Sequence, residues 1–266
     1  MFHLLATTLA ANILVLTPLG PRSHMNCIRP LIEVLAERGH QLTVVTAHPA
    51  KIEAPNVRNI VMNELVDLIE VEWYDFKHHG AISNMIGVLQ FFQHMSLAYD
   101  RFMTNEEIQI IKRNKNYDIA IVDEILNDFT FPLVDHLGIP FIFFDPGPGT
   151  IWSMAAKDVD RQYASIPPLF GAADSQMTFF QRMANLLMTE TTLAIRRYFL
   201  ISAFDKLAEK DFPNARPCAE IERDAQLTFV NIHPTTSYMR PLPATFIPVG
   251  AMHVRPANPL PQVIYT

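Results

Sequence analysis

The sequence predicts an α/β protein built on a Rossmann-like, mostly parallel β-sheet. Short apolar runs that do not alternate with polar residues, at 12–17 and 119–122, are typical of strands buried on both faces. Stretches with apolar residues at helical spacing separate such runs, and Gly39 and Gly138 each follow a stretch of this kind as a helix stop. Strands that alternate with helices favour an open parallel sheet with helices on both faces.

The first expected unit is a strand, a loop, a helix and a second strand. Residues 12–17 form the first strand, and a loop follows over 19–25. Because proline is tolerated near the start of a helix and kinks its interior, Pro30 predicts that regular helix begins close to Asn26. Residues 41–46, rich in β-branched side chains, are the next strand, so this succession is one βαβ unit.

A second unit of the same kind is expected further along the chain. A helical stretch from about 82 to 114, with Met, Phe and Leu on one side, precedes the strand at 119–122. A helix over 128–137 and a strand over 140–144 complete the unit.

The chain changes character after Asp145. Proline and glycine at 146–149 and 166–168 mark a long irregular segment. The elements expected beyond it are a helix at about 175–207 and short strands at 227–230 and 246–249. The Met and Phe side chains of 82–103 and 177–199 are interpreted as core faces, and some of them could also line an apolar ligand pocket.

We expect one domain over residues 12–254, flanked by two segments of different character. Residues 1–11 are either a short signal segment or an apolar extension of the first strand, because residues 4–11 are apolar but no Lys or Arg precedes them. Residues 255–266 are rich in proline and are expected to form an extended linker. No apolar run reaches the roughly 18 residues that a transmembrane helix needs.

Composition and spacing narrow the classes of function. The 266 residues carry a net charge of −6 without a basic stripe, so nucleic acid is not an expected partner. Cys27 and Cys218 give neither a disulfide framework nor a metal-ligand spacing. His78 and His79 lie in a polar stretch, where solvated side chains are the simpler interpretation and metal binding is the alternative. Neither a G-x-G-x-x-G fingerprint nor a P-loop occurs, so no nucleotide cofactor is predicted.

The predicted fold indicates where a ligand binds. In a doubly wound parallel sheet, ligands bind outside the carboxyl ends of the strands at the point where the strand order reverses, usually between the first and fourth strands. His24 lies in the loop after the first strand, and Asp123 ends the strand that we number fourth. We therefore expect an imidazole and a carboxylate at one crevice, hydrogen-bonded or nearly so.

A histidine beside a carboxylate is a candidate general base. An imidazole with its ordinary pKa of about 6.5 can accept a proton at neutral pH, and a carboxylate fixes its tautomer and stabilises the imidazolium. Such a pair can activate a hydroxyl group for attack on an electrophilic carbon. Taken singly, His24 and Asp123 each have a simpler interpretation, because a polar residue ahead of a helix commonly caps it.

Several separate motifs resemble the animal UDP-glycosyltransferases, with insect and baculoviral (ecdysteroid-type) members the most alike. The resemblance covers nearly the whole chain in order. The motifs that carry it are TPLGPRSH at 17–24, PLIEVLAERGHQLTVV at 30–45, YDIAIVD at 117–123, LGIPF at 137–141, IPP at 166–168, MTFFQRMAN at 177–185, FVNIH at 229–233, RPLP at 240–243 and VGAMH at 249–253.

The resemblance implies a fold, a reaction and two residue roles. The fold is the N-terminal, acceptor-binding domain of a two-domain GT-B glycosyltransferase. His24 is implied to be the catalytic base and Asp123 its partner in an inverting transfer. The group transferred is hexosyl or glucuronosyl, from a UDP-sugar to the hydroxyl of a small lipophilic acceptor. The family also implies the lumen or membrane of the endoplasmic reticulum, with membrane association in a full-length form.

The motifs of the family's donor-binding half do not occur up to Thr266. We therefore expect a UDP-sugar to bind only together with a C-terminal domain, and the chain alone to be inactive. A different class of function stays open: a non-catalytic module that binds a lipophilic ligand, or one that regulates full-length relatives by pairing with them.

Overall fold

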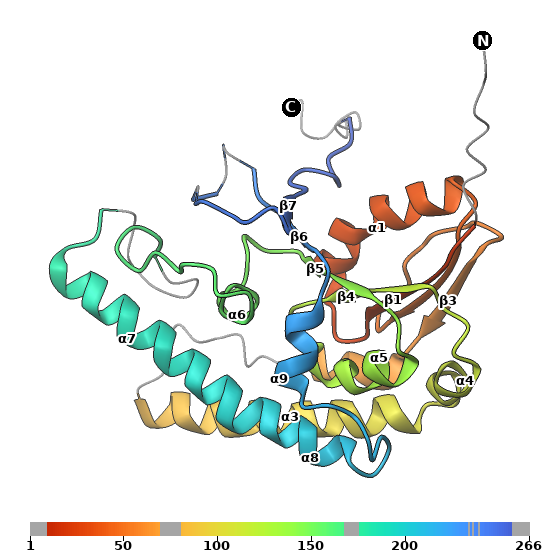
Figure 1. Ribbon diagram of the computed structural model, residues 1–266, viewed down its shortest axis with the longest axis horizontal. Coiled ribbons are helices and arrows are strands. Elements are labelled where there is room, and N and C mark those ends of the chain that lie inside the picture. Colours follow the sequence, from red (N-terminus) through yellow and green to blue (C-terminus); the bar gives the residue numbers. More distant parts are fainter. Residues whose placement is uncertain are drawn as a thin grey trace, which may run out of the picture.

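A seven-stranded parallel sheet lies at the centre of the computed structural model (Figure 1). The structure describes residues 10–69, 81–167 and 176–256, apart from 234, 236 and 239. Within 81–167, the side chains are described from residue 93 onward. The strand order is β3-β2-β1-β4-β5-β6-β7, which confirms the predicted Rossmann-like fold class. The strands are β1 (Asn12–Thr17), β2 (Gln41–Thr46), β3 (Val57–Val61), β4 (Ile119–Asp123), β5 (Phe141–Asp145), β6 (Thr228–Val230) and β7 (Phe246–Pro248).

Helices lie in most of the connections between strands and cover the sheet (Figure 1). The α-helices are α1 (Arg22–Glu37), α2 (Val66–Ile69), α3 (Ala81–Thr104), α4 (Glu106–Asn114), α5 (Phe131–Leu137), α6 (Ile151–Ala156), α7 (Phe179–Ile195), α8 (Ser202–Ala208) and α9 (Cys218–Ile221). A π-helical turn, Arg196–Ile201, joins α7 to α8, and 3₁₀ turns lie at Asn63–Leu65, Asp128–Thr130 and Glu222–Asp224.

The central strands are buried on both faces, as their unalternating apolar runs predict. Leu14 and Leu16 of β1 pack into a core with residues of α3, α5 and α8. Ile13 and Val15, which point to the opposite face, pack into a second core with residues of α1. Helices therefore cover both faces of the sheet.

The strand order reverses between β1 and β4. These strands are parallel neighbours with Leu16 opposite Val122, so the next residues, Thr17 and Asp123, end at the same edge of the sheet. The strand ending at Asp123 is indeed the fourth, because β3 precedes it. The sequence patterns did not reveal β3, an edge strand in which only Ile60 is fully buried.

Helix α1 begins earlier than predicted, at Arg22 rather than near Asn26. The Pro21 carbonyl oxygen accepts the backbone N–H of His24 at 2.9 Å, which starts the first turn. Pro30 lies inside the helix, where its ring removes a single backbone N–H donor and the helix continues past it. His24 therefore lies in the first turn of a helix and not in a loop.

Two expected long helices are each divided. The stretch from 82 to 114 is α3 followed by α4, because the Asn105 side chain caps a new helix by accepting the backbone N–H of Glu107 at 3.0 Å. The stretch at 175–207 is α7, the π turn and α8.

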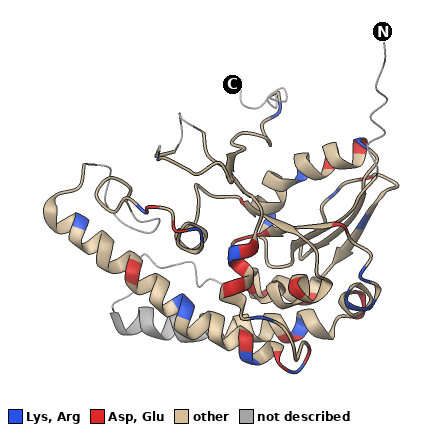
Figure 2. Cartoon of the chain, in the orientation of Figure 1, with Lys and Arg blue, Asp and Glu red and all other residues tan. Residues whose placement is uncertain are grey.

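The interpretation of 177–199 as a core face is wrong for most of α7. Its buried residues are the polar Asn185 and Thr189, whereas Phe179, Phe180 and Leu187 are 70%, 82% and 62% exposed. Figure 2 shows few charged residues along this helix. Asn185 faces the protein because it donates to the carbonyl oxygens of Tyr163 and Ile166 in the neighbouring loop, and Thr189, one turn later, donates to Asn185 Oδ1. The helical period then turns the apolar side chains outward.

Several predictions lie outside the described residues. The described residues do not include 1–9 and 257–266. The interpretations of 1–11 as a signal segment or strand extension and of 255–266 as a linker therefore stay predictions. The domain limits of 12–254 are likewise predictions. His78 and His79 also lie outside the described ranges. At the described C-terminal edge, the Arg255 guanidinium pairs with Glu33 of α1.

Candidate active site

The turn between β1 and α1 passes close to the end of β4. The backbone N–H of Gly20 donates to the Thr17 carbonyl oxygen at 3.1 Å, which tightens the turn. A Cβ atom at Gly20 would lie 2.0 Å from Thr17 Oγ1 and 2.9 Å from Asp123 Oδ2. Only glycine therefore allows this close approach, which carries α1 and His24 over the sheet edge.

The structure brings His24 and Asp123 together as the sequence predicts. His24 Nδ1 lies 2.7 Å from Asp123 Oδ2. The Asp123 side chain is 1% exposed, whereas that of His24 is 14% exposed. The carboxylate is thus enclosed by protein, and the imidazole remains accessible at its surface.

Two further donors hold the Asp123 carboxylate in place. Thr17 Oγ1 donates to Oδ2 at 3.1 Å, and the backbone N–H of Ile125 donates to Oδ1 at 3.1 Å. A carboxylate that accepts these bonds requires the proton of His24 on Nδ1. That tautomer leaves Nε2 free of a proton and able to accept one.

The acidic surroundings favour the protonated imidazole. Burial by itself lowers the pKa of His24, but the charge and hydrogen bond of Asp123, with a smaller contribution from Asp145, outweigh burial and raise the pKa above its ordinary value. The arrangement therefore makes His24 a stronger base than an isolated histidine.

A second pair of acidic side chains lies beside the dyad. Asp145 ends β5 and accepts the backbone N–H groups of Gly147 at 2.7 Å and Thr150 at 2.6 Å, which fixes the glycine-rich loop after the strand. Glu124, next to Asp123, accepts the hydroxyl of Thr150. Burial raises the pKa of both carboxyl groups, to about 6 for Asp145 and well above its ordinary value for Glu124.

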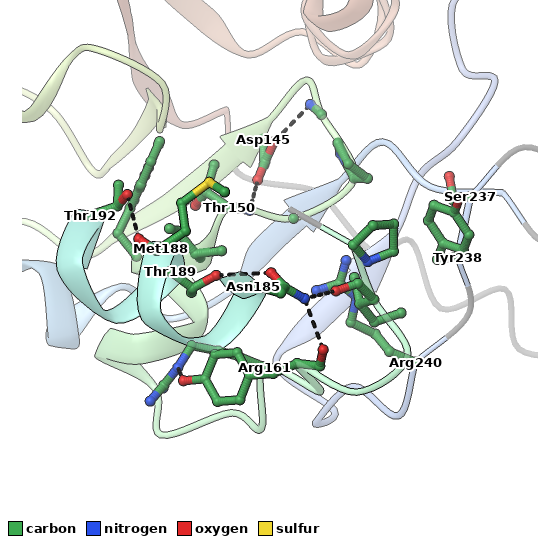
Figure 3. Close-up of a pocket in the computed structure, with 18 of the residues that line it drawn as sticks. Asp145, Thr150, Arg161, Asn185, Met188, Thr189, Thr192, Ser237, Tyr238 and Arg240 are labelled. Atoms are coloured by element: carbon green, nitrogen blue, oxygen red, sulfur yellow. Dashed lines mark hydrogen bonds between the residues drawn. The ribbon is translucent and has the colours of Figure 1, made fainter. Parts of the chain in front are cut away.

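A cavity of about 480 Å³ opens beside this loop (Figure 3). The loop after β5, α6, α7 and the segment between β6 and β7 form its walls, and its lining includes Ile125, Asp145, Ile151, Ile166, Met188 and Arg240. His24 and Asp123 are not part of the lining. Asp145 joins the two regions, because it lines the cavity and also acts on the pKa of His24.

Three further features from the sequence concern metal sites, membrane spans and the two cysteines. Within the described ranges, no group of three or more His, Cys, Asp or Glu side chains is arranged to hold a metal ion. Over the same ranges, no helix combines the length and the apolar character needed to cross a membrane. Cys27, one turn of α1 beyond His24, and the buried Cys218 are both free thiols.

Sequence reasoning missed three side chains near the site. Asp145 and Glu124 lie at the carboxyl ends of neighbouring strands, so the rule that pointed to Asp123 also pointed to them. Arg240 begins the RPLP motif at 240–243, but it lies in the irregular segment between β6 and β7, where no periodic pattern indicates which way a side chain points.

Comparison with known proteins gives consistent matches. Residues 12–266 match the family model "UDP-glucoronosyl and UDP-glucosyl transferase". The chain is 27% identical to "UDP-glycosyltransferase UGT5" of Dactylopius coccus, covering 95% of this chain and 49% of the relative. It is 22% identical to "UDP-glucuronosyltransferase 2C1" of Oryctolagus cuniculus, covering 90% of this chain and 51% of the relative.

Among solved structures, the calicheamicin glycosyltransferase CalG4 matches with a TM-score of 0.47 and 14% identity, over 91% of this chain and 53% of that one. The chain spans about half the length of the curated relatives that it matches.

Proposed function

The chain belongs to the UDP-glucuronosyl and UDP-glucosyl transferase family, and from this premise we propose that it is the acceptor-binding part of a sugar-transferring enzyme. The reaction is the transfer of a hexosyl or glucuronosyl group from a UDP-sugar to a hydroxyl of a small lipophilic acceptor. The proposal depends chiefly on one observation, the 2.7 Å contact between His24 Nδ1 and Asp123 Oδ2 at the reversal point of the sheet.

The proposed chemistry uses the free nitrogen of the dyad. His24 Nε2 accepts the proton of the acceptor hydroxyl as its oxygen attacks the anomeric carbon. The new carbon–oxygen bond forms on the face opposite the bond to UDP, which breaks, and UDP leaves with the electron pair, so the transfer is inverting. Asp123 stabilises the imidazolium that forms and keeps the ring in its reactive tautomer.

The cavity lined by Asp145 and Met188 is the proposed acceptor site. Its volume of about 480 Å³ falls within the usual range for small-molecule sites, roughly 300–1,000 Å³. Aliphatic side chains such as Ile125, Ile151 and Ile166 suit a lipophilic molecule. The relatives are about twice as long as the matched chain, and we propose that residues of that further length hold the UDP-sugar.

The deciding test joins this chain to the C-terminal half of UGT5 from Dactylopius coccus and measures sugar transfer to simple phenols. We expect turnover in the joined enzyme, and a loss of about 10²–10⁴-fold in kcat for His24→Ala, the usual contribution of a general base. Acceptor binding to the unjoined chain should not change. His253→Ala, at an exposed histidine, is the matched control.

The same experiment distinguishes the enzyme from a non-catalytic ligand-binding or regulatory module. If the joined enzyme turns over equally well with and without His24, the dyad is not catalytic. A chain that binds phenols but supports no transfer in any joined form would instead fit a ligand-binding or regulatory module. The cavity suits both classes, whereas the His24–Asp123 pair favours the enzyme.

A further inference from the structure

The Arg240 side chain lies in the wall of the cavity with an unmet capacity for hydrogen bonding. It is half-buried, and within the described part of the chain its side chain makes one hydrogen bond, from Nη1 to Met154 Sδ at 3.0 Å. A thioether sulfur is a weak acceptor, whereas a guanidinium carries five N–H donors. Among the described residues, no carboxylate lies within ion-pair distance of Arg240.

Two other arginines near the cavity have carboxylate partners. Arg161, which also lines the cavity, forms an ion pair with Glu190 at 3.1 Å and donates to the Tyr163 hydroxyl at 2.5 Å. Arg196, behind the cavity, pairs with two buried carboxylates. Arg240 is thus the cavity arginine whose charge the described residues leave without a partner.

Asp145, the acidic side chain in the cavity lining, binds its own loop and not Arg240. Each oxygen of Asp145 accepts a backbone N–H of its own loop, from Gly147 and Thr150. In Figure 3, Asp145 and Arg240 lie on different sides of the cavity. Burial lowers the pKa of Arg240, and the distant charge of Asp145 offsets this only in part. The guanidinium is therefore partly buried with no carboxylate of the described residues close enough to pair with it, an arrangement that an anionic ligand would improve.

We propose that Arg240 binds an anionic oxygen group of the acceptor, so that the cavity prefers hydroxy acids, aromatic molecules with a hydroxyl at one end and a carboxylate at the other. This inference rests on the proposed function of the cavity. A carboxylate matches the planar fork of a guanidinium and can accept two parallel N–H bonds. The apolar walls then enclose the body of the molecule, and repulsion from Asp145 keeps the acid at the Arg240 side.

The test compares 3-(4-hydroxyphenyl)propanoate with its methyl ester, which has the same ring and hydroxyl but no charge. Both are titrated calorimetrically into the unmodified chain, without any donor. The acid is expected to bind about tenfold more tightly than the ester, which corresponds to about 1.4 kcal/mol and lies at the low end for a hydrogen bond to a charged group.

Variants assign the preference to one residue. Arg240→Gln should remove the preference for the acid and leave the affinity for the ester unchanged, which also shows that the variant is folded. Arg240→Lys should keep part of the preference, because the charge remains and the fork is lost. Arg216→Gln, at an exposed arginine outside this cavity that pairs with Asp135 and Asp224, should keep it.

Each outcome supports or overturns the assignment of the acid preference to Arg240. Equal binding of acid and ester by the unmodified chain, or an undiminished preference in Arg240→Gln, overturns the inference and leaves the acceptor cavity standing. Binding of neither compound overturns the acceptor cavity as well. The comparison of acid with ester in the unmodified chain needs no variant, so a misfolded Arg240→Gln would not prevent a decision.

Discussion

Replacing Asp123 with asparagine tests the dyad with the smallest change of shape. From the described residues the carboxylate accepts three hydrogen bonds, two at Oδ2 from His24 and Thr17 and one at Oδ1 from Ile125. An asparagine offers one oxygen and one NH₂ group at these positions. If the NH₂ group faces His24, the ring proton must move to Nε2 and the base is lost. If the oxygen faces His24, the N–H of Ile125 is opposed by another donor.

The expected loss follows from the burial of the pair. The Asp123 side chain is 1% exposed, so water cannot replace the missing charge. A hydrogen bond to a charged group contributes about 1.5–3 kcal/mol. Because about 1.36 kcal/mol corresponds to a tenfold change in rate, kcat should fall by about 10- to 150-fold, and further if the wrong tautomer dominates.

The assay measures kcat in the enzyme joined to a donor half, at saturating UDP-sugar and acceptor. The affinity of the unjoined chain for the acceptor should be unchanged, because Asp123 does not line the cavity. The matched control is Asp118→Asn, just before β4, where the carboxylate accepts the exposed backbone N–H of Asn12 at 2.7 Å. A folded Asp123→Asn enzyme with kcat within about threefold of the unmodified one would refute the reasoning.

Three further predictions concern stability. Arg196→Met leaves Asp128 and Glu222, each 6% exposed, without their cation, which should cost about 3–5 kcal/mol and lower Tm by about 6–20 °C in calorimetry; an unchanged Tm would contradict this. Glu124→Gln should become progressively more stable than the parent as pH rises above 4.5, because the native carboxyl group, with its raised pKa, retains a proton that the unfolded chain releases. Urea unfolding at pH 5 and pH 7 measures the difference in unfolding free energy between variant and parent, and the same difference at both pH values would contradict the prediction. Gly138→Ala should cost only about 1–2 kcal/mol of unfolding free energy, since φ is +68° but no atom lies within 4 Å of the added Cβ; a much larger loss in urea would show a clash.

The sequence by itself determined the fold class and the position of Asp123 at the site. Short unbroken apolar runs are typical of strands buried on both faces, and together with the glycine stops they predicted β1, β4 and β5 and the existence of the helices between them. The strand-end rule then places Asp123 at the crevice. It fails to exclude Asp145 and Glu124, because a carboxylate at a strand end can cap a loop as well as assist a base, and the sequence does not distinguish these roles.

Only the tertiary structure decided how the side chains meet. It extends α1 back over the sheet edge, because one lost N–H at Pro30 does not stop a helix that is packed on a core. It turns the polar side of α7 inward, because Asn185 donates to the carbonyl oxygens of Tyr163 and Ile166 across the cavity wall. It also brings Arg240 into the cavity from a segment without periodicity. Such contacts join residues distant in sequence, and their free energy depends on burial, which a local pattern does not contain.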